Sequence, residues 1–212
     1  MEKKVYRITY LKIKDKRSFF EFRKQLKKQR KQLLPDLNFA LFESFFSFPK
    51  KNAVNAFVEI MEWKNMSEYE KSKIHLDRIS LNLNESDFLE IEEDFILETE
   101  KGEAFSIVNL KEENLVVEFA SRTIKEKKKK IFSAKKEEFL SFFRKQQGYY
   151  IDQEFKEITK DINVLFFVWK SQTDFENAGN KVKKSLKLIF KVFKYFSLIK
   201  QKAFQVGKYL RE

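Results

Sequence analysis

Cysteine is absent from the 212-residue chain, and glycine, proline and histidine are scarce, with 4, 2 and 1 copies. Without cysteine the chain can form no disulfide, thiolate metal site or thiol nucleophile, which is compatible with a reducing compartment. The few glycines and prolines predict short loops and little disorder. A single histidine also argues against a zinc site, which needs three or four protein ligands.

The chain also lacks a long apolar run. Its N-terminal stretch, MEKKVYRITYLKIK, alternates like a strand and indicates neither a signal peptide nor a membrane span. We therefore expect a cytoplasmic protein. Gly-rich phosphate loops, a Ser-His-Asp order, paired-histidine motifs and dinucleotide fingerprints are missing as well. Most standard enzyme classes are disfavoured by these absences, and we expect neither a metal nor a cofactor.

Basic residues outnumber acidic ones by 44 to 32, which gives a net charge of +12. Such an excess favours anionic partners through long-range attraction. Because it is mostly lysine on expected helices and in segment 125–136, without a nucleic-acid-binding signature, a solvated surface is favoured and nucleic-acid binding is not. A non-enzymatic protein that binds an anionic polymer or a protein partner is the alternative function that this charge leaves open.

Aromatic residues are abundant, and the two tryptophans mark a repeat. Residues 58–70, VEIMEWKNMSEYE, match residues 164–176, VLFFVWKSQTDFE. In both segments an apolar run precedes the tryptophan, which predicts a strand buried on both faces. Ser67 and Thr173 are each followed three residues later by a glutamate, so they are the expected N-caps of the helices that follow.

The elements around the two segments repeat in the same order. In the first half we expect strands over 5–13, 39–48 and 58–63 and within 95–110, helices after 15 and over 67–81, and a short acidic helix over 84–93. The first helix sets basic residues, among them Arg23 and Arg30, opposite an apolar stripe. The second half repeats this pattern, with an extra helix over 185–197. The sequence therefore predicts an α+β protein of two β-α-β-β-α-β units, residues 1–112 and 113–212.

A strand that ends in Trp-Lys, followed by a turn and a capped helix, resembles the antibiotic biosynthesis monooxygenase family of the dimeric α+β barrel superfamily, here in tandem. The resemblance rests on Trp63, Lys64, Asn65 and Tyr69 and on Trp169, Lys170, Ser171 and Phe175. It implies two fused ferredoxin-like repeats whose sheets pack face to face as an intramolecular pseudo-dimeric barrel. We expect a monomer with this internal pseudo-dimer, or a weak homodimer.

The resemblance also implies a function. Some members of the superfamily are cofactor-independent monooxygenases of aromatic polyketides or quinols, and relatives degrade heme. By analogy, we expect a pocket in the first repeat, lined by Trp63 and Tyr69, for a small planar hydrophobic ligand of aromatic, quinone-like or heme-like type. Phe175 lacks the hydroxyl group of Tyr69, so the second repeat is expected to be a structural partner.

Two polar groups complete the expected ligand site. Glu59 and Leu165 stand where the family pattern has an asparagine. A buried Glu59 would have a raised pKa and could transfer protons. Alternatively, it could point to solvent at a sheet edge or meet a lysine across the strand. His75 on the helix could act as a base or heme ligand, or simply lie on the surface. The Trp–Tyr pair could also be a hydrophobic plug, with phenylalanine filling the pocket and a likeness limited to architecture.

Overall fold

A computed structural model of the chain describes residues 3–48, 54–99, 106–107 and 115–210. These residues contain eight strands and five α-helices. In chain order they are β1 (Val5–Ile13), α1 (Lys16–Leu33), β2 (Asn38–Phe48), β3 (Ala56–Trp63), α2 (Met66–Asn82), β4 (Leu89–Thr99), β5 (Val116–Ile124), α3 (Lys129–Phe143), β6 (Tyr149–Glu157), β7 (Asn163–Trp169), α4 (Gln172–Lys183), α5 (Leu186–Phe196) and β8 (Ile199–Leu210).

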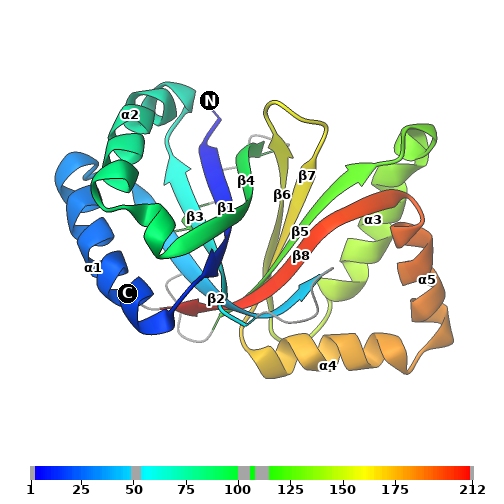
Figure 1. Cartoon of the computed structure of the whole chain (residues 1–212). Helices are drawn as coiled ribbons and strands as arrows, with labels where there is room; N and C mark the ends of the chain where they lie inside the picture. Colours follow the sequence, from blue (N-terminus) through cyan, green and yellow to red (C-terminus); the bar gives the residue numbers. More distant parts are fainter. Residues whose placement is uncertain (1–2, 49–53, 100–105, 108–114, 211–212) are drawn as a thin grey trace.

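The strands close into one antiparallel barrel in the order β1-β3-β2-β8-β5-β7-β6-β4. Strands β1 to β4 form one half of the circle in the order β4-β1-β3-β2, and β5 to β8 form the other half in the matching order β8-β5-β7-β6. Pairing of β2 with β8 and of β4 with β6 joins the halves. Helices α1 and α2 cover the outside of the first half, and α3, α4 and α5 cover the second (Figure 1).

The barrel interior is a single apolar core to which both halves contribute. Successive side chains of a strand point to opposite faces, so an apolar run such as that of β3 buries both. Val58 and Ile60 point into the barrel, where they share a cluster with Val164 and Phe166 of β7. The alternate residues of each strand face the helices. Any ligand site between sheet and helices is therefore built from these outward-facing residues.

Two helix starts differ from the sequence-based expectation. The N-caps of α2 and α4 are Asn65 and Ser171, two residues earlier than expected, and Ser67 lies in the first turn of α2. The Asn65 side chain accepts from the backbone N–H of Glu68 at 2.9 Å, and Ser171 accepts from that of Asp174 at 3.1 Å. The capped-helix prediction is correct, but its capping residues were wrong.

The acidic helix expected over 84–93 is also wrong. Only Glu85–Asp87 forms one 3-10 turn, and β4 begins at Leu89. From Phe95 to Thr99 every second residue is buried, which is the period of a strand with one solvated face, and most of the acidic residues lie before this stretch. No helix in the described ranges is long and apolar enough to cross a membrane.

Candidate functional site

The structure brings Trp63 and Tyr69 together at the end of β3. Their ring centroids lie 5.1 Å apart at an interplanar angle of 77°, an edge-to-face contact. Both rings are buried and share a cluster with Val5, Met61 and Leu76. The indole nitrogen of Trp63 has no hydrogen-bond partner within the described part of the chain. This pair forms a packed apolar contact between the sheet and α2.

Glu59 faces α1 and is held by two arginines. Arg30 donates to both carboxylate oxygens, at 2.7 and 3.1 Å, and Arg23 donates to one of them. Burial alone would raise the pKa of Glu59, but the two guanidinium groups lower it to about 2. The expected rise in this pKa is therefore wrong. His75 is exposed on α2 and lies apart from this buried cluster.

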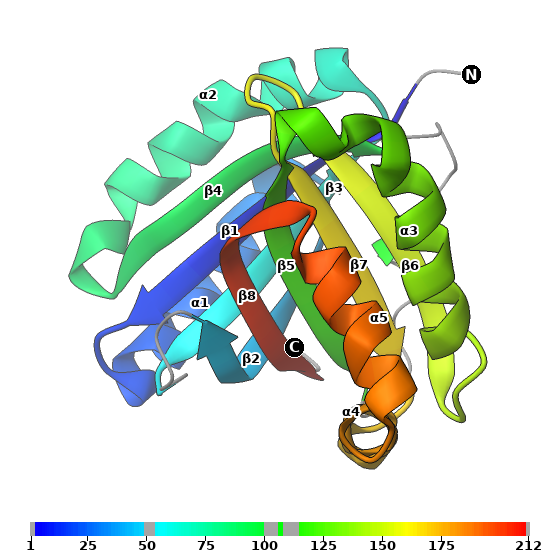
Figure 2. The ribbon, with the colours of Figure 1, turned by 90° about the vertical axis from the view of Figure 1, so that its right-hand side faces the viewer.

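An apolar cavity of about 290 Å³ lies in the second half, between the outer faces of β5 and β7 and helices α3, α4 and α5. Figure 2 shows these three helices on that side of the barrel. Together with Tyr195, seven aromatic side chains form half of its lining: Phe139, Phe143, Phe167, Trp169, Phe175, Phe196 and Phe204. Its polar lining consists of Glu118, Arg122, Lys183 and Tyr195. A concave apolar space with a few polar groups is the usual form of a small-molecule site.

The strand register shows why the cavity occurs on the outer sheet face of the second half and not on that of the first. Arg7 pairs with Met61 in the first half, and Glu118 pairs with Phe167 at the matching position of the second. Arg7 makes a two-point ion pair with Asp94, at 2.8 and 3.0 Å, which occupies the outer face of the first sheet. The second sheet instead presents small and apolar residues beside Glu118, including Ala120. The space therefore opens under the helices of the second half.

Glu118 is the acidic group of this cavity. The indole nitrogen of Trp169 donates to its carboxylate at 2.5 Å, and no cation pairs with it among the described residues. Burial raises the pKa of Glu118 to about 7, although the hydrogen bond from Trp169 opposes the rise. Near neutral pH this carboxyl group is present in both protonation states, as a proton-transfer group requires.

Arg122 lies on the same face of β5, four residues and roughly 13 Å further along the strand. It is buried, and it donates to Glu154 and to the hydroxyl oxygen of Tyr195. Its Nε atom has no partner in the described ranges. Burial raises the pKa of Tyr195 to about 12, so its phenol stays protonated. The cavity thus has an acidic end at Glu118 and a cationic end at Arg122.

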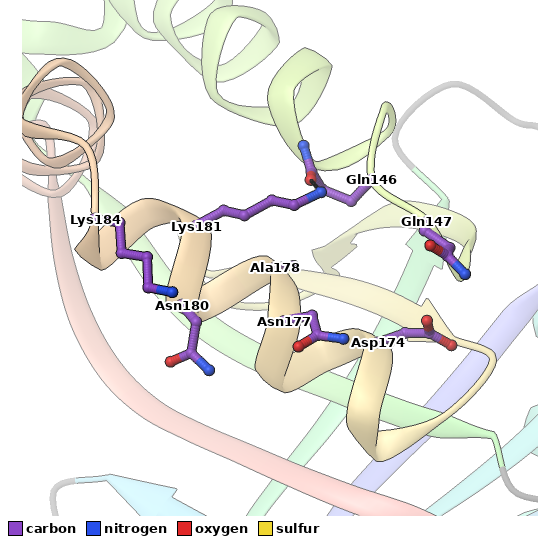
Figure 3. A pocket seen from close by; sticks show the side chains of 8 residues that line it. All are labelled: Gln146, Gln147, Asp174, Asn177, Ala178, Asn180, Lys181 and Lys184. Atoms are coloured by element: carbon purple, nitrogen blue, oxygen red, sulfur yellow. Dashed lines mark hydrogen bonds between the residues drawn. The ribbon is translucent and has the colours of Figure 1, made fainter.

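A second hollow, outlined in Figure 3, is polar and lies along α4 beside the end of α3. Some of its side chains already have partners: Lys181 donates to Gln146 at 3.0 Å, and Asp174 accepts from Ser171 at 2.7 Å. Gly148, with φ of 75°, lets the chain approach Asp174 closely, since a Cβ there would lie 2.1 Å from its Cγ. Because Asp174 packs closely against Gly148, the polar hollow is explained by packing, and the apolar cavity is the better candidate site.

The sequence did not point to Glu118, Arg122 or Tyr195. The available signal was an acid within an apolar strand, VVEFA, the same pattern that singled out Glu59. No cluster of three or more acidic or histidine side chains that could hold a metal occurs among residues 3–48, 54–99, 106–107 and 115–210.

Comparison with known proteins identifies the fold. No protein-family model matches the sequence, and no curated protein does either. A Fusobacterium nucleatum protein, provisionally named a monooxygenase, is 10% identical with a TM-score of 0.63, covering 98% of this chain and 93% of that one. An anthrone oxidase-like protein is 6% identical with a TM-score of 0.64, covering 99% and 92%. A heme-binding protein from Thermus thermophilus is 12% identical with a TM-score of 0.61, covering 100% and 92%. The chain therefore has the dimeric α+β barrel fold that its sequence resembles.

Proposed function

We propose that the protein is a monooxygenase-like enzyme that binds a small planar aromatic molecule in the cavity of its second half. One observation carries the proposal: the Glu118 carboxylate accepts a hydrogen bond from the Trp169 indole at the lining of an aromatic cavity, where burial raises its pKa. The names of two similar structures, a provisional monooxygenase and an anthrone oxidase-like protein, agree with oxidation of an aromatic compound.

The size of the cavity favours a compact ligand. At about 290 Å³ it is at the lower end of the range of ligand pockets, which suits a molecule of about three fused rings rather than a tetrapyrrole. Ala120 and Leu165, which pair across β5 and β7, line the cavity together with several phenylalanine rings, so a ring system could lie against the sheet. The only histidine, His75, lies in the other half, so the cavity offers no imidazole to a heme iron.

The two ends of the cavity suit oxidation of an acidic methylene or phenol. Glu118 would accept a proton from the substrate, and the positive charge of Arg122 would stabilise the resulting anion. With dioxygen as oxidant, a ring CH₂ group becomes C=O while the second oxygen atom leaves as water. The electrons come from the two C–H bonds, so the reaction requires no external reductant.

Oxygen uptake with anthrone, a three-ring methylene compound, tests this function. We expect one dioxygen consumed per anthrone and loss of at least about a hundredfold in rate for Glu118→Gln. Glu43→Gln, on the first half, is the control and should retain the rate. A Glu118→Gln protein as fast as the wild type would contradict the proposal.

The sequence predicted a ligand site in the first half, at Trp63, Tyr69, Glu59 and His75. This first-half site is the rival to the cavity of the second half. A ligand there would have to separate the packed Trp63 and Tyr69 rings, and it would find the Glu59 carboxylate already bound to two arginines. The rival therefore requires a rearrangement that the cavity of the second half does not.

We also infer that residues 1–112 and 113–212 are two copies of one ferredoxin-like unit fused into an intramolecular pseudo-dimer. The matching strand orders support this inference, as does the register in which Trp63 pairs with Val5 and Trp169 with Val116. A closed barrel leaves no free sheet edge for another chain to extend. We expect a monomer by light scattering.

A further inference from the structure

Helix α5 presents large apolar side chains to solvent. Leu186, Phe190 and Phe193 are 75%, 72% and 68% exposed. Because they occur at positions i, i+4 and i+7, they lie along one side of the helix. The inner side of the helix, with Val192 and Tyr195, forms a wall of the cavity. Helix α5 is therefore apolar on its outer side as well as on its inner side.

The chain segment that carries this outer stripe is strongly basic, although Glu138 of α3 pairs with Lys191 of α5 at 3.4 Å. Residues 177–210 contain nine lysines and no acidic residue. Lys187 and Lys194 are exposed on α5, and at 100° per residue they follow one flank of the stripe. Lys183 and Lys184, just before α5, are exposed as well. Apolar and cationic groups thus lie side by side along a helix of 11 residues, roughly 16 Å long.

We propose that α5 docks the protein on an anionic lipid surface. Leu186, Phe190 and Phe193 would enter the boundary between headgroups and acyl chains, and the flanking lysines would contact the lipid phosphates. The helix would lie in the plane of the surface and would not cross it. This proposal is independent of the reaction assigned to the cavity.

Other binding partners would suit only the apolar part or only the basic part of this surface. A second copy related by twofold symmetry would bring two acid-free, lysine-rich segments together, which like-charge repulsion disfavours. A nucleic acid would satisfy the lysines but would leave Leu186 and two phenylalanines in water, since side chains on a helix ridge make no platform for stacked bases. A lipid interface supplies anionic groups and an apolar phase within the length of one short helix.

Vesicle sedimentation of the full chain tests the proposal. We expect binding to vesicles that contain phosphatidylglycerol and little binding to pure phosphatidylcholine. Phe190→Ser and Phe193→Ser should each weaken binding about tenfold, and added salt should weaken it further. The matched control is Ile74→Ser with Leu81→Ser on α2, at sites that are 75% and 76% exposed, which should bind as the wild type does.

Several outcomes would overturn the proposal. These are no vesicle binding, equal binding to both vesicle types, or unchanged binding by the Phe190→Ser/Phe193→Ser double variant. A wild-type dimer that this double variant converts to a monomer, without vesicle binding, would show that the stripe mediates self-association instead. Circular dichroism checks that each variant is folded, which is expected because the substituted side chains are exposed.

Discussion

The indole N–H of Trp169 donates to Glu118 at 2.5 Å, whereas the indole N–H of Trp63 has no partner in the described residues. Both tryptophans end their strands, and each contacts the aromatic residue six positions on, Tyr69 or Phe175. The difference between them follows from a neighbouring strand, where the first half has Arg7 at the position of Glu118. One repeated motif thus supports a packed face in one half and a cavity with a titrating acid in the other.

Glu118→Gln should raise stability at high pH. Between the ordinary carboxyl pKa of 4.5 and the raised value of about 7, the folded protein holds a proton that the unfolded chain has released. Stability therefore falls as pH rises through this window, by on the order of 1–2 kcal/mol once contact with solvent is allowed for. The variant should match the wild type near pH 4 and exceed it at pH 8. Urea unfolding at both pH values measures this, and equal pH dependence in the two proteins would show that Glu118 is not desolvated.

Glu59→Gln should be strongly destabilising. The substitution leaves the buried guanidinium groups of Arg23 and Arg30 without their anion, a change that costs about 3–5 kcal/mol. The control Glu43→Gln removes an exposed pair with Lys16 and should change stability by less than about 1 kcal/mol. Denaturant midpoints compare the two variants. A small effect at Glu59 would mean that the carboxylate is free to serve a ligand, as the sequence suggested.

Gly179→Leu should fill the cavity without harming the fold. Gly179 lies within α4 and lines the cavity, and a Cβ built on it meets no heavy atom within 4 Å. Replacing a helical glycine also gains about 0.5–1 kcal/mol of helix propensity. We expect a higher melting temperature together with loss of ligand binding. A lower melting temperature would show that the space beside Gly179 is not open.

The sequence predicted most strands and helices because their signals are local and repeated, whereas the barrel was implied by the family resemblance. Alternating runs such as residues 5–13 and the tryptophan segments fix strands and helix starts, and two matching halves imply one fold. Side-chain contacts between elements that are far apart in the sequence could not be predicted from such local patterns. Helix periodicity placed Arg23 and Arg30 on a solvated face, and their burial depends on Glu59, 29 to 36 residues away on another strand. The cavity depends on side-chain sizes across six elements, β5, β7, β8, α3, α4 and α5, and no single sequence pattern reports such a combination.

Fluorescence titration with 1,8-dihydroxyanthraquinone tests the central claim, that the cavity of the second half is the ligand site. In Trp63→Phe protein the remaining indole, Trp169, lines the cavity. We expect saturable quenching at one ligand per chain, and its loss when Gly179→Leu is added. Saturable quenching that Gly179→Leu leaves unchanged would place the ligand elsewhere and contradict the account.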